Sequence, residues 1–221
     1  MATGSAGGQG MAKKRFQALW NRCLLAGMTD DGVAVYRELK KRYSEPHRFY
    51  HTPNHISHCL REFDLAAELM DNADAVEMGL WFHDVIYDPR ASNNELKSAE
   101  LFQLRADDHM DPRFRQRVYD LILITIHPEQ PRNRDQEFMV DIDLSSFGLP
   151  WSAFRHDSNA VRNEYVHMSD KQFYPAQIRF LRSLLARPSF FFTEFFRDRY
   201  EETAKSNITR HIDELNALGY A

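Results

Sequence analysis

The sequence predicts a single all-α domain, and three observations support that fold class. Apolar residues recur at three- and four-residue spacings along most of the chain, which is the period of an amphipathic helix. No segment shows the strict alternation of apolar and polar residues, with regularly spaced turns, that is typical of a β-sandwich. The chain has 221 residues, of which 43% are hydrophobic and 27% charged, and these values suit one medium-sized globular domain.

Capping residues mark where two helices of the first half begin. Thr52 followed by Pro53 is an N-cap with proline at the first helical position. Ser92, with Glu95 three residues later, forms a capping-box pattern, so we expect the next helix to begin there. The same apolar period, and therefore further helix, extends over residues 14–43 and 74–87.

The second half of the chain is also predicted to be helical. Asp111 followed by Pro112 begins a helix that ends at His127, before Pro128. Residues 138–147 are too short for the apolar period to decide between helix and strand. Further helices are predicted over residues 151–168, 175–186, 189–194 and 195–218.

Charge and composition argue against several classes of protein. With 28 Lys and Arg against 32 Asp and Glu, the net charge of −4 is wrong for a general nucleic-acid binder. No stretch of about 18 apolar residues occurs, so we expect no membrane span. The two cysteines, Cys23 and Cys59, are expected to be reduced thiols of a cytoplasmic protein. Residues 1–12 are expected to be a flexible leader or tag, ahead of a domain over residues 13–221.

The pair His83-Asp84 is the first candidate for chemistry, because it lies in an otherwise apolar helical run. A charged Asp in such a run is costly unless something compensates its charge. A divalent metal ion would do so, and it requires deprotonated ligands of this kind. The pair alone is explained equally well by a buried histidine beside an aspartate that caps a neighbouring helix.

Two other segments supply further nitrogen and oxygen donors. His55 lies in the first turn of the helix that Thr52 begins, and Asp141 and Asp143 alternate with apolar residues later in the chain. A mixed set of imidazole and carboxylate ligands suits a divalent ion such as Mn, Fe, Co, Zn or Mg rather than a thiolate-selecting ion. The residues alone leave either aspartate as the last ligand.

This order of motifs resembles the HD-domain superfamily of metal-dependent phosphohydrolases, and most closely its branch of uncharacterised predicted phosphohydrolases. The resemblance covers about residues 16–218 and rests on Arg48-Phe49-Tyr50-His51, His55-Ile56, Phe82-His83-Asp84-Val85-Ile86-Tyr87-Asp88, Asn94-Glu95, Ser98-Ala99, Thr125 with His127, Asp143-Leu144, Arg162 with Glu164-Tyr165, and Asn207.

The resemblance implies an HD-type helical bundle whose metal ligands are His55, His83, Asp84 and Asp143. Asp143 is preferred to Asp141 because superfamily members commonly carry the last ligand as Asp followed by Leu. The implied cofactor is one divalent ion, with Mn, Fe, Co, Ni, Zn and Mg as candidates. The implied activity is hydrolysis of a small phosphorylated substrate, with a nucleotide as the expected class, through a metal-activated water.

Attack by water also needs a group that positions it. Asp88, four residues after Asp84, and Glu95 are the candidates, although the capping box also explains Glu95. Alarmone hydrolases of the superfamily carry Glu where this chain has Tyr87, which argues against guanosine tetraphosphate as the substrate. The candidates for contacting phosphate are Arg48, His51, His127 and Arg162.

Other interpretations remain open at this stage. His51 is also explained as a side chain that orients the site. His51, His58 and His127 together keep an HD-type oxygenase with two iron ions as an alternative, and a noncatalytic metal or nucleotide sensor is another. The aromatic run over residues 190–196 is expected to be core, with a homodimer face as its alternative.

Overall fold

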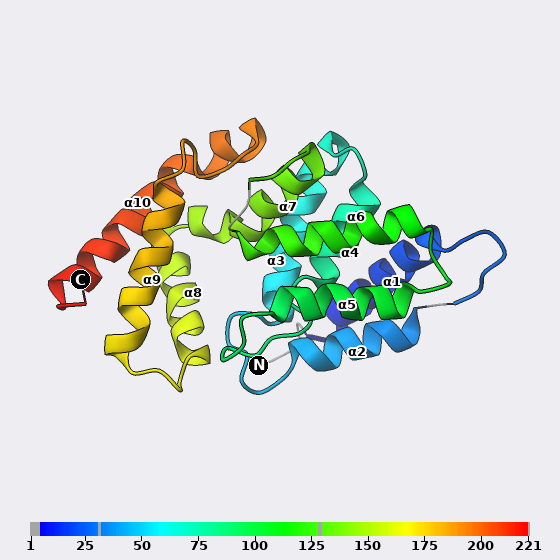
Figure 1. Ribbon diagram of the computed structural model, residues 1–221, viewed down its shortest axis with the longest axis horizontal. Helices are drawn as coiled ribbons and strands as arrows, with labels where there is room; N and C mark the ends of the chain where they lie inside the picture. The colour runs from blue at the N-terminus through cyan, green and yellow to red at the C-terminus, as the bar shows by residue number, and fades with distance from the viewer. Residues whose placement is uncertain (1–4, 31, 128–129, 221) are drawn as a thin grey trace.

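The computed structural model describes residues 5–30, 32–127 and 130–220, and every regular element within these ranges is helical (Figure 1). The α-helices are α1 (Ser5–Cys23), α2 (Val33–Tyr43), α3 (Pro53–Ala66), α4 (Ala73–Phe82), α5 (Asn94–Ala106), α6 (Pro112–Leu123), α7 (Arg134–Leu144), α8 (Trp151–Glu164), α9 (Asp170–Leu185) and α10 (Glu194–Ala217). Three short 3-10 helices, η1 (Ala67–Leu69), η2 (Ile124–Ile126) and η3 (Ser145–Gly148), extend α3, α6 and α7. The predicted all-α class is confirmed, since the described residues contain only one isolated β-bridge and no strand.

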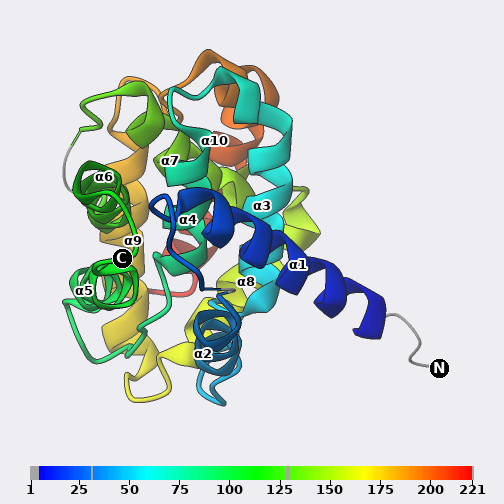
Figure 2. The same ribbon diagram turned by 90° about the vertical axis from the view of Figure 1, so that its right-hand side faces the viewer.

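Helix α4 lies in the middle of the molecule, with α1, α3, α6 and α7 packed around it (Figure 2). Residues 75–82 of this helix are all buried, because apolar side chains occur on nearly all of its sides. Gly79 allows a close approach: a Cβ there would lie 3.4 Å from both Leu121 Cβ in α6 and Met139 Sδ in α7. The C-terminal end of α4, where His83 follows, therefore lies inside the fold.

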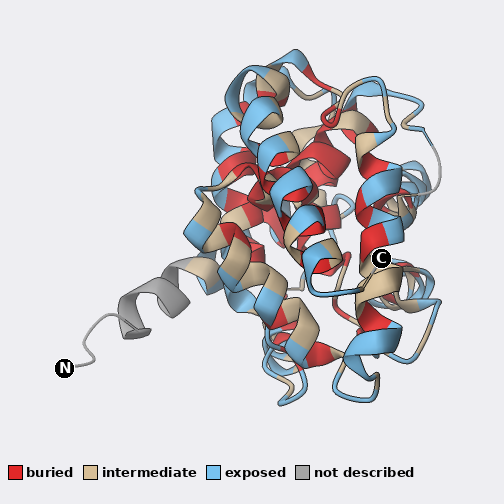
Figure 3. Cartoon of the chain, turned by 90° about the vertical axis from the view of Figure 1, so that its left-hand side faces the viewer, coloured by how far each residue is buried: buried red, intermediate tan, exposed pale blue. Residues whose placement is uncertain are grey.

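The other helices form two groups on either side of this centre. Helices α8, α9 and α10 lie together at one end of the view in Figure 1, and α1, α2, α5 and α6 lie at the other. Buried positions gather between the helices while the outward faces are exposed (Figure 3). The aromatic run belongs to this interior, since Phe190, Phe191 and Phe196 have no exposed surface. These three residues are core, as expected, whereas Phe192 and Phe195 of the same run are half-buried.

Two predicted N-caps are confirmed and one is wrong. The side chain of Thr52 accepts a hydrogen bond from Asn54 N at the start of α3, and the Asp111 side chain likewise caps α6. Helix α5, however, begins after Asn93 rather than Ser92. The preceding turn is closed instead by Asn94, which accepts from Asp88 N and donates to Asp88 O, so Glu95 belongs to no capping box.

Three other boundaries differ from the prediction. The ambiguous residues 138–147 are helical: residues 138–144 belong to α7, which begins earlier, after the N-cap Asn133, and residues 145–147 belong to η3. Helix α9 begins at Asp170 rather than at residue 175, because Ser169 and Gln172 form a capping box. The predicted helix over residues 151–168 ends at Glu164.

The helix predicted over residues 189–194 is wrong. The backbone N–H groups of residues 190–191 donate to the Glu201 carboxylate, and those of residues 192–193 donate to the Asp141 carboxylate. Because two acidic side chains hold four successive donors, this segment stays irregular until α10 begins. We call residues 190–193 the strap.

Two sequence-based expectations concern the ends and the surface of the chain. Residues 1–4 lie outside the described residues and α1 begins at Ser5, so the leader over residues 1–12 stays a prediction. Among the described helices, none combines the length and the apolar composition that crossing a bilayer requires.

Candidate metal centre

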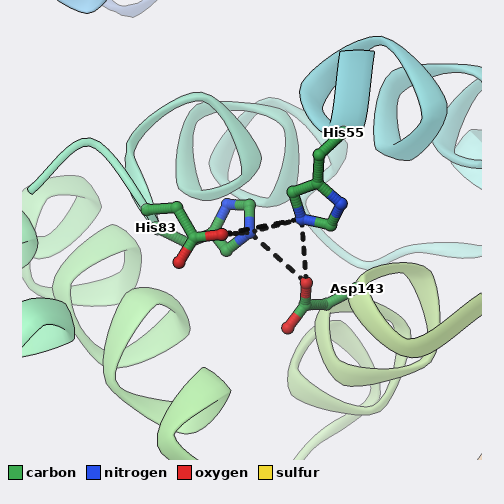
Figure 4. A group of neighbouring side chains, drawn as sticks. His55, His83 and Asp143 are labelled. Carbon is green, nitrogen blue, oxygen red and sulfur yellow. Dashed lines mark hydrogen bonds and ion pairs between the residues drawn. The ribbon is translucent and has the colours of Figure 1, made fainter. Parts of the chain in front are cut away.

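Three helix ends bring the four predicted ligands together. His55 lies in the first turn of α3, His83 and Asp84 follow the end of α4, and Asp143 lies in the last turn of α7. Figure 4 shows His55, His83 and Asp143 pointing toward one another. One ligand atom from each of the four residues lies within 4.8 Å of the others, so the group could hold a metal ion.

The distances between these atoms suit a shared ion. The two imidazole Nε2 atoms, of His55 and His83, lie 3.2 Å apart. Asp143 Oδ1 lies 3.2 Å from the first and 3.4 Å from the second, and Asp84 Oδ2 lies 3.6 Å and 3.0 Å from them. Ligands bound at about 2.0–2.2 Å to one ion are roughly 3.0–3.5 Å apart in tetrahedral or octahedral geometry. The residues therefore fit a divalent ion.

A hydrogen bond to the last turn of α4 fixes how His83 presents its ring. His83 Nδ1 lies 2.9 Å from Leu80 O, and because a carbonyl oxygen only accepts, Nδ1 carries the proton. In the neutral imidazole this leaves a lone pair on Nε2, which faces the cluster. A backbone carbonyl thus selects the tautomer that a metal ion needs.

The charges of the cluster depend strongly on one another. Burial lowers the pKa of His83, but the carboxylates of Asp84 and Asp143 outweigh it and raise the pKa well above the ordinary value. Burial would raise the pKa of Asp84 and Asp143, but the surrounding imidazoles reverse this and lower both. Without another cation, the carboxylates thus favour a protonated His83; a divalent ion would take over that neutralising role.

The two aspartates of α7 have different surroundings. Asp143 faces the cluster, whereas Asp141 is fully buried and accepts hydrogen bonds from Phe192 N, Thr193 N and Thr193 Oγ1. Burial raises the pKa of Asp141 to about 7, against the effect of these three donors. Asp141 therefore holds the strap, and the preference for Asp143 as the ligand agrees with the geometry.

A cavity of about 510 Å³ opens against the cluster. Asp84 and Asp143 line it with side chains that are 14% exposed, while the side chains of His55 and His83 are 2% and 1% exposed. The imidazoles thus close the cluster from behind, and the carboxylates form its open side. A metal site with an open side is the form that catalytic sites take.

His51, His127 and Glu95 also line this cavity. His127 Nε2 lies 3.2 Å from Asp143 Oδ2, and His51 Nε2 lies 4.0 Å from Asp84 Oδ2. Burial raises the pKa of Glu95 above its ordinary value. These three predicted residues are therefore beside the candidate metal ligands.

Glu164 fixes the position of His51, a role that was not predicted from the sequence. Its Oε2 lies 2.7 Å from His51 Nδ1 and accepts a hydrogen bond from Tyr87 OH, while its Oε1 accepts three backbone N–H groups of residues 49–51. Burial would raise the pKa of Glu164, but His51 and these donors lower it to about 2. The sequence signal for this role was the pair Glu164-Tyr165 in the family motif. The contact with His51 could not be inferred from it, because the two residues are 113 positions apart.

Arg48, which was predicted to contact phosphate, does not line the cavity. Its guanidinium is fully buried and donates to the backbone oxygens of His51, Asp84 and Val85 and to the Glu45 carboxylate. It therefore stabilises the turn that carries Asp84, because backbone carbonyl groups outside a helix need donors when they are buried.

Two further predicted residues also lie outside the cavity. Asp88 is exposed, and its carboxylate accepts from Arg90 N within a turn. Arg162 pairs with Asp170 and donates to two backbone oxygens of the loop between α8 and α9. Both residues were predicted to belong to the site because they are close in sequence to its motifs, but their side chains bind to local turns instead.

His58, considered for a second iron ion, contacts Ser145 Oγ at 2.8 Å instead of the cluster. Burial lowers its pKa to about 4. The cysteines are both free thiols; Cys59 is buried, and burial raises its pKa well above the ordinary value.

Comparison with known proteins gives no relatives for this chain: no family model, curated protein or solved structure matches it.

Proposed function

We propose that this protein is a metal-dependent phosphohydrolase that binds one divalent ion between His55, His83, Asp84 and Asp143. The observation that carries the proposal is the position of this group at the wall of a cavity large enough for a small molecule. Two neutral imidazoles and two carboxylates balance the charge of a divalent ion. A phosphate group would therefore approach a centre without surplus negative charge.

When bound, a divalent ion lowers the pKa of water and polarises a phosphoryl oxygen. The chain's own residues would do the rest. Glu95, which lines the same cavity, is placed to orient the attacking water, and His51 and His127 offer hydrogen bonds to the phosphoryl group. Glu164 orients His51 from behind. Asp88 is dropped from this scheme because its carboxylate is exposed and bound in a turn.

A second candidate function is an oxygenase with two iron ions. The observation that favours it is that Asp143 has both oxygens engaged on different sides, Oδ1 toward His55 and Oδ2 toward His127. In such a centre Asp143 would help to hold both ions, with His55 on one side and His127 on the other. Two irons per chain with substrate-dependent oxygen consumption would support this candidate instead.

The first experiment is metal analysis of protein purified without chelating resin, followed by phosphate release from aryl phosphates and nucleotides with Mn, Co, Fe, Ni, Zn or Mg. We expect about one ion per chain and hydrolysis that His83→Ala abolishes. Asp198→Ala, at an exposed position of α10, is the matched control and should retain both. Bound metal without turnover of any ester would contradict hydrolysis and favour a sensor.

We further propose a cytoplasmic location, on the grounds that both cysteines are free and that nothing in the charge suggests a membrane surface.

A further inference from the structure

The cavity wall that α8 and α9 form differs in its side chains from the charged wall at the candidate metal centre. It is mainly apolar and aromatic, with Phe154, Val161, Tyr165, Phe173 and Phe180 among its residues. Phe180 is 42% exposed although it lines the cavity, so it lies where the cavity opens to solvent. An apolar body could therefore enter and pack against this wall.

Two oxygen acceptors on this wall lack partners. Within the described residues, the Asp157 carboxylate takes part in no hydrogen bond or ion pair, and burial raises its pKa. Gln177 Oε1 is buried without any hydrogen-bond partner. A buried acceptor that is left unsatisfied costs free energy, so Gln177 Oε1 favours a ligand that donates a hydrogen bond. Asp157 is only half-buried, and its carboxylate is a charged acceptor that no side chain of the described residues occupies.

The cavity also lacks the cations that several phosphate groups would need. Among the described residues that line it, none is Lys or Arg. Its remaining acids are Glu95 and Asp157, and its remaining cation candidates are His51 and His127, both close to the metal ligands. A single phosphoryl group at the metal could be accommodated, whereas a longer phosphate chain would extend toward uncompensated carboxylates.

We infer that the cavity selects phosphomonoesters whose other end is an apolar or aromatic body bearing an N–H donor, which Asp157 and Gln177 bind. The inference rests on the proposed function, because it assigns the phosphoryl end to the candidate metal centre. The donor can be the exocyclic amino group of a nucleobase or the ammonium group of an aryl alkylamine. Asp157 is then a specificity residue that touches the substrate away from the reacting atoms.

Two pairs of compounds separate these sources, each pair differing in the donor alone. Adenosine and purine riboside differ by the exocyclic amino group, and 4-(2-aminoethyl)phenyl phosphate and 4-ethylphenyl phosphate differ by the ammonium. Calorimetry with the metal-loaded protein measures their binding, and phosphate release measures kcat/KM for the two esters. At least one pair should show about 10-fold or greater preference for the donor-bearing member, since hydrogen bonds to charged groups are worth this much or more.

The variant that tests the assignment is Asp157→Ala, which suits helix α8 and removes no hydrogen bond or ion pair within the described residues. It should reduce the preference to less than about 3-fold, through weaker binding or a lower kcat/KM of the donor-bearing member of the pair. Asp198→Ala, in α10 and outside the cavity, should keep the preference. Melting curves of both variants check that the fold is retained.

The results distinguish this inference from the function on which it rests. Equal binding of both members in both pairs, with 4-ethylphenyl phosphate still hydrolysed, would overturn donor recognition and leave the phosphohydrolase standing. A preference that Asp157→Ala removes, without hydrolysis of any ester, would overturn the phosphohydrolase and leave donor recognition standing. Faster hydrolysis of ATP than of AMP would overturn the selection of monoesters.

Discussion

His127 Nε2 lies 3.2 Å from Oδ2 of Asp143, while the other oxygen of the same carboxylate faces His55 and His83. His127 adopts a left-handed backbone conformation, with φ of 63°, at the residue that ends η2. A non-glycine residue seldom adopts this conformation, and here it accompanies a side chain directed at the carboxylate. His127 is thus placed to set the direction of Asp143.

Replacing His127 tests that role. His127→Ala should weaken metal binding by about 10-fold or more, because partners of metal ligands contribute at this level. Competition with a fluorescent chelator gives the affinity. An unchanged affinity together with reduced ester hydrolysis would show that His127 acts on the substrate and not on Asp143.

Asp141→Ala separates a structural aspartate from a ligating one. The substitution removes the acceptor of three hydrogen bonds from the strap, so the free energy of unfolding should fall by about 2–4 kcal/mol. Urea unfolding measures the loss. The folded variant should still bind metal, and loss of metal equal to that of Asp143→Ala would contradict the division of roles between the two aspartates.

Arg48→Met tests whether the buried guanidinium supports the fold or the substrate. Loss of its donors leaves the carbonyl groups of Asp84 and Val85 without partners, so stability should fall by about 2–4 kcal/mol. The KM for an aryl phosphate should remain within a few-fold at a temperature where the variant is folded. A stable variant with a strongly raised KM would restore Arg48 as a phosphate ligand.

Asp88 and Glu95 make a matched pair of acids near the site, one outside the cavity and one within it. Asp88→Asn should leave kcat within about 2-fold, because its carboxylate accepts from the backbone of a turn. Glu95→Gln should lower kcat by about 10-fold or more if it orients the attacking water. Steady-state kinetics with one metal decide between them, and the reverse order of effects would return the role to Asp88.

His211, which is remote from the candidate metal ligands, should make the free energy of unfolding depend on pH. Burial, with the neighbouring Arg155, lowers its pKa to about 4, below the ordinary value of 6.5. Between these values the unfolded chain binds the proton and the folded chain does not, so stability falls as the pH drops from about 6.5 toward 4. His211→Gln should reduce that slope, by at most ~1.4 kcal/mol per pH unit. Denaturant unfolding at several pH values measures it, and an unchanged slope would contradict the assignment.

The helical class and several of the caps were predictable because they depend on local sequence. Thr52-Pro53 and Asp111-Pro112 carry their signal within two residues, and both caps form as expected. The irregular strap was not predictable, because the carboxylate of Asp141 that holds its end comes from about 50 residues earlier.

In the candidate site, too, some features could be predicted from the sequence, whereas others depend on tertiary contacts. The four candidate metal ligands were implied by the family resemblance that the motifs carry, and their side chains do come together. The directions of Arg48 and Arg162 did not follow, because a guanidinium reaches whichever carbonyl the tertiary fold leaves open. Asp157 was not predicted as a site residue, because it stands out only by lacking a hydrogen-bond or ion-pair partner among the described residues. That property cannot be read from a sequence.

The four ligands come from α3, the end of α4 and the end of α7, so an ion bound there would tie three helices that are distant along the chain. Metal affinity would then depend on how these helices are packed. A substitution that shifts one of them relative to the others would change the distances between the ligand atoms, even if the substituted residue lies on the far side of the core. By linkage, the ion in turn would raise the melting temperature in proportion to how much better it binds the folded chain. Such a centre would stabilise the tertiary structure whether or not a substrate is present.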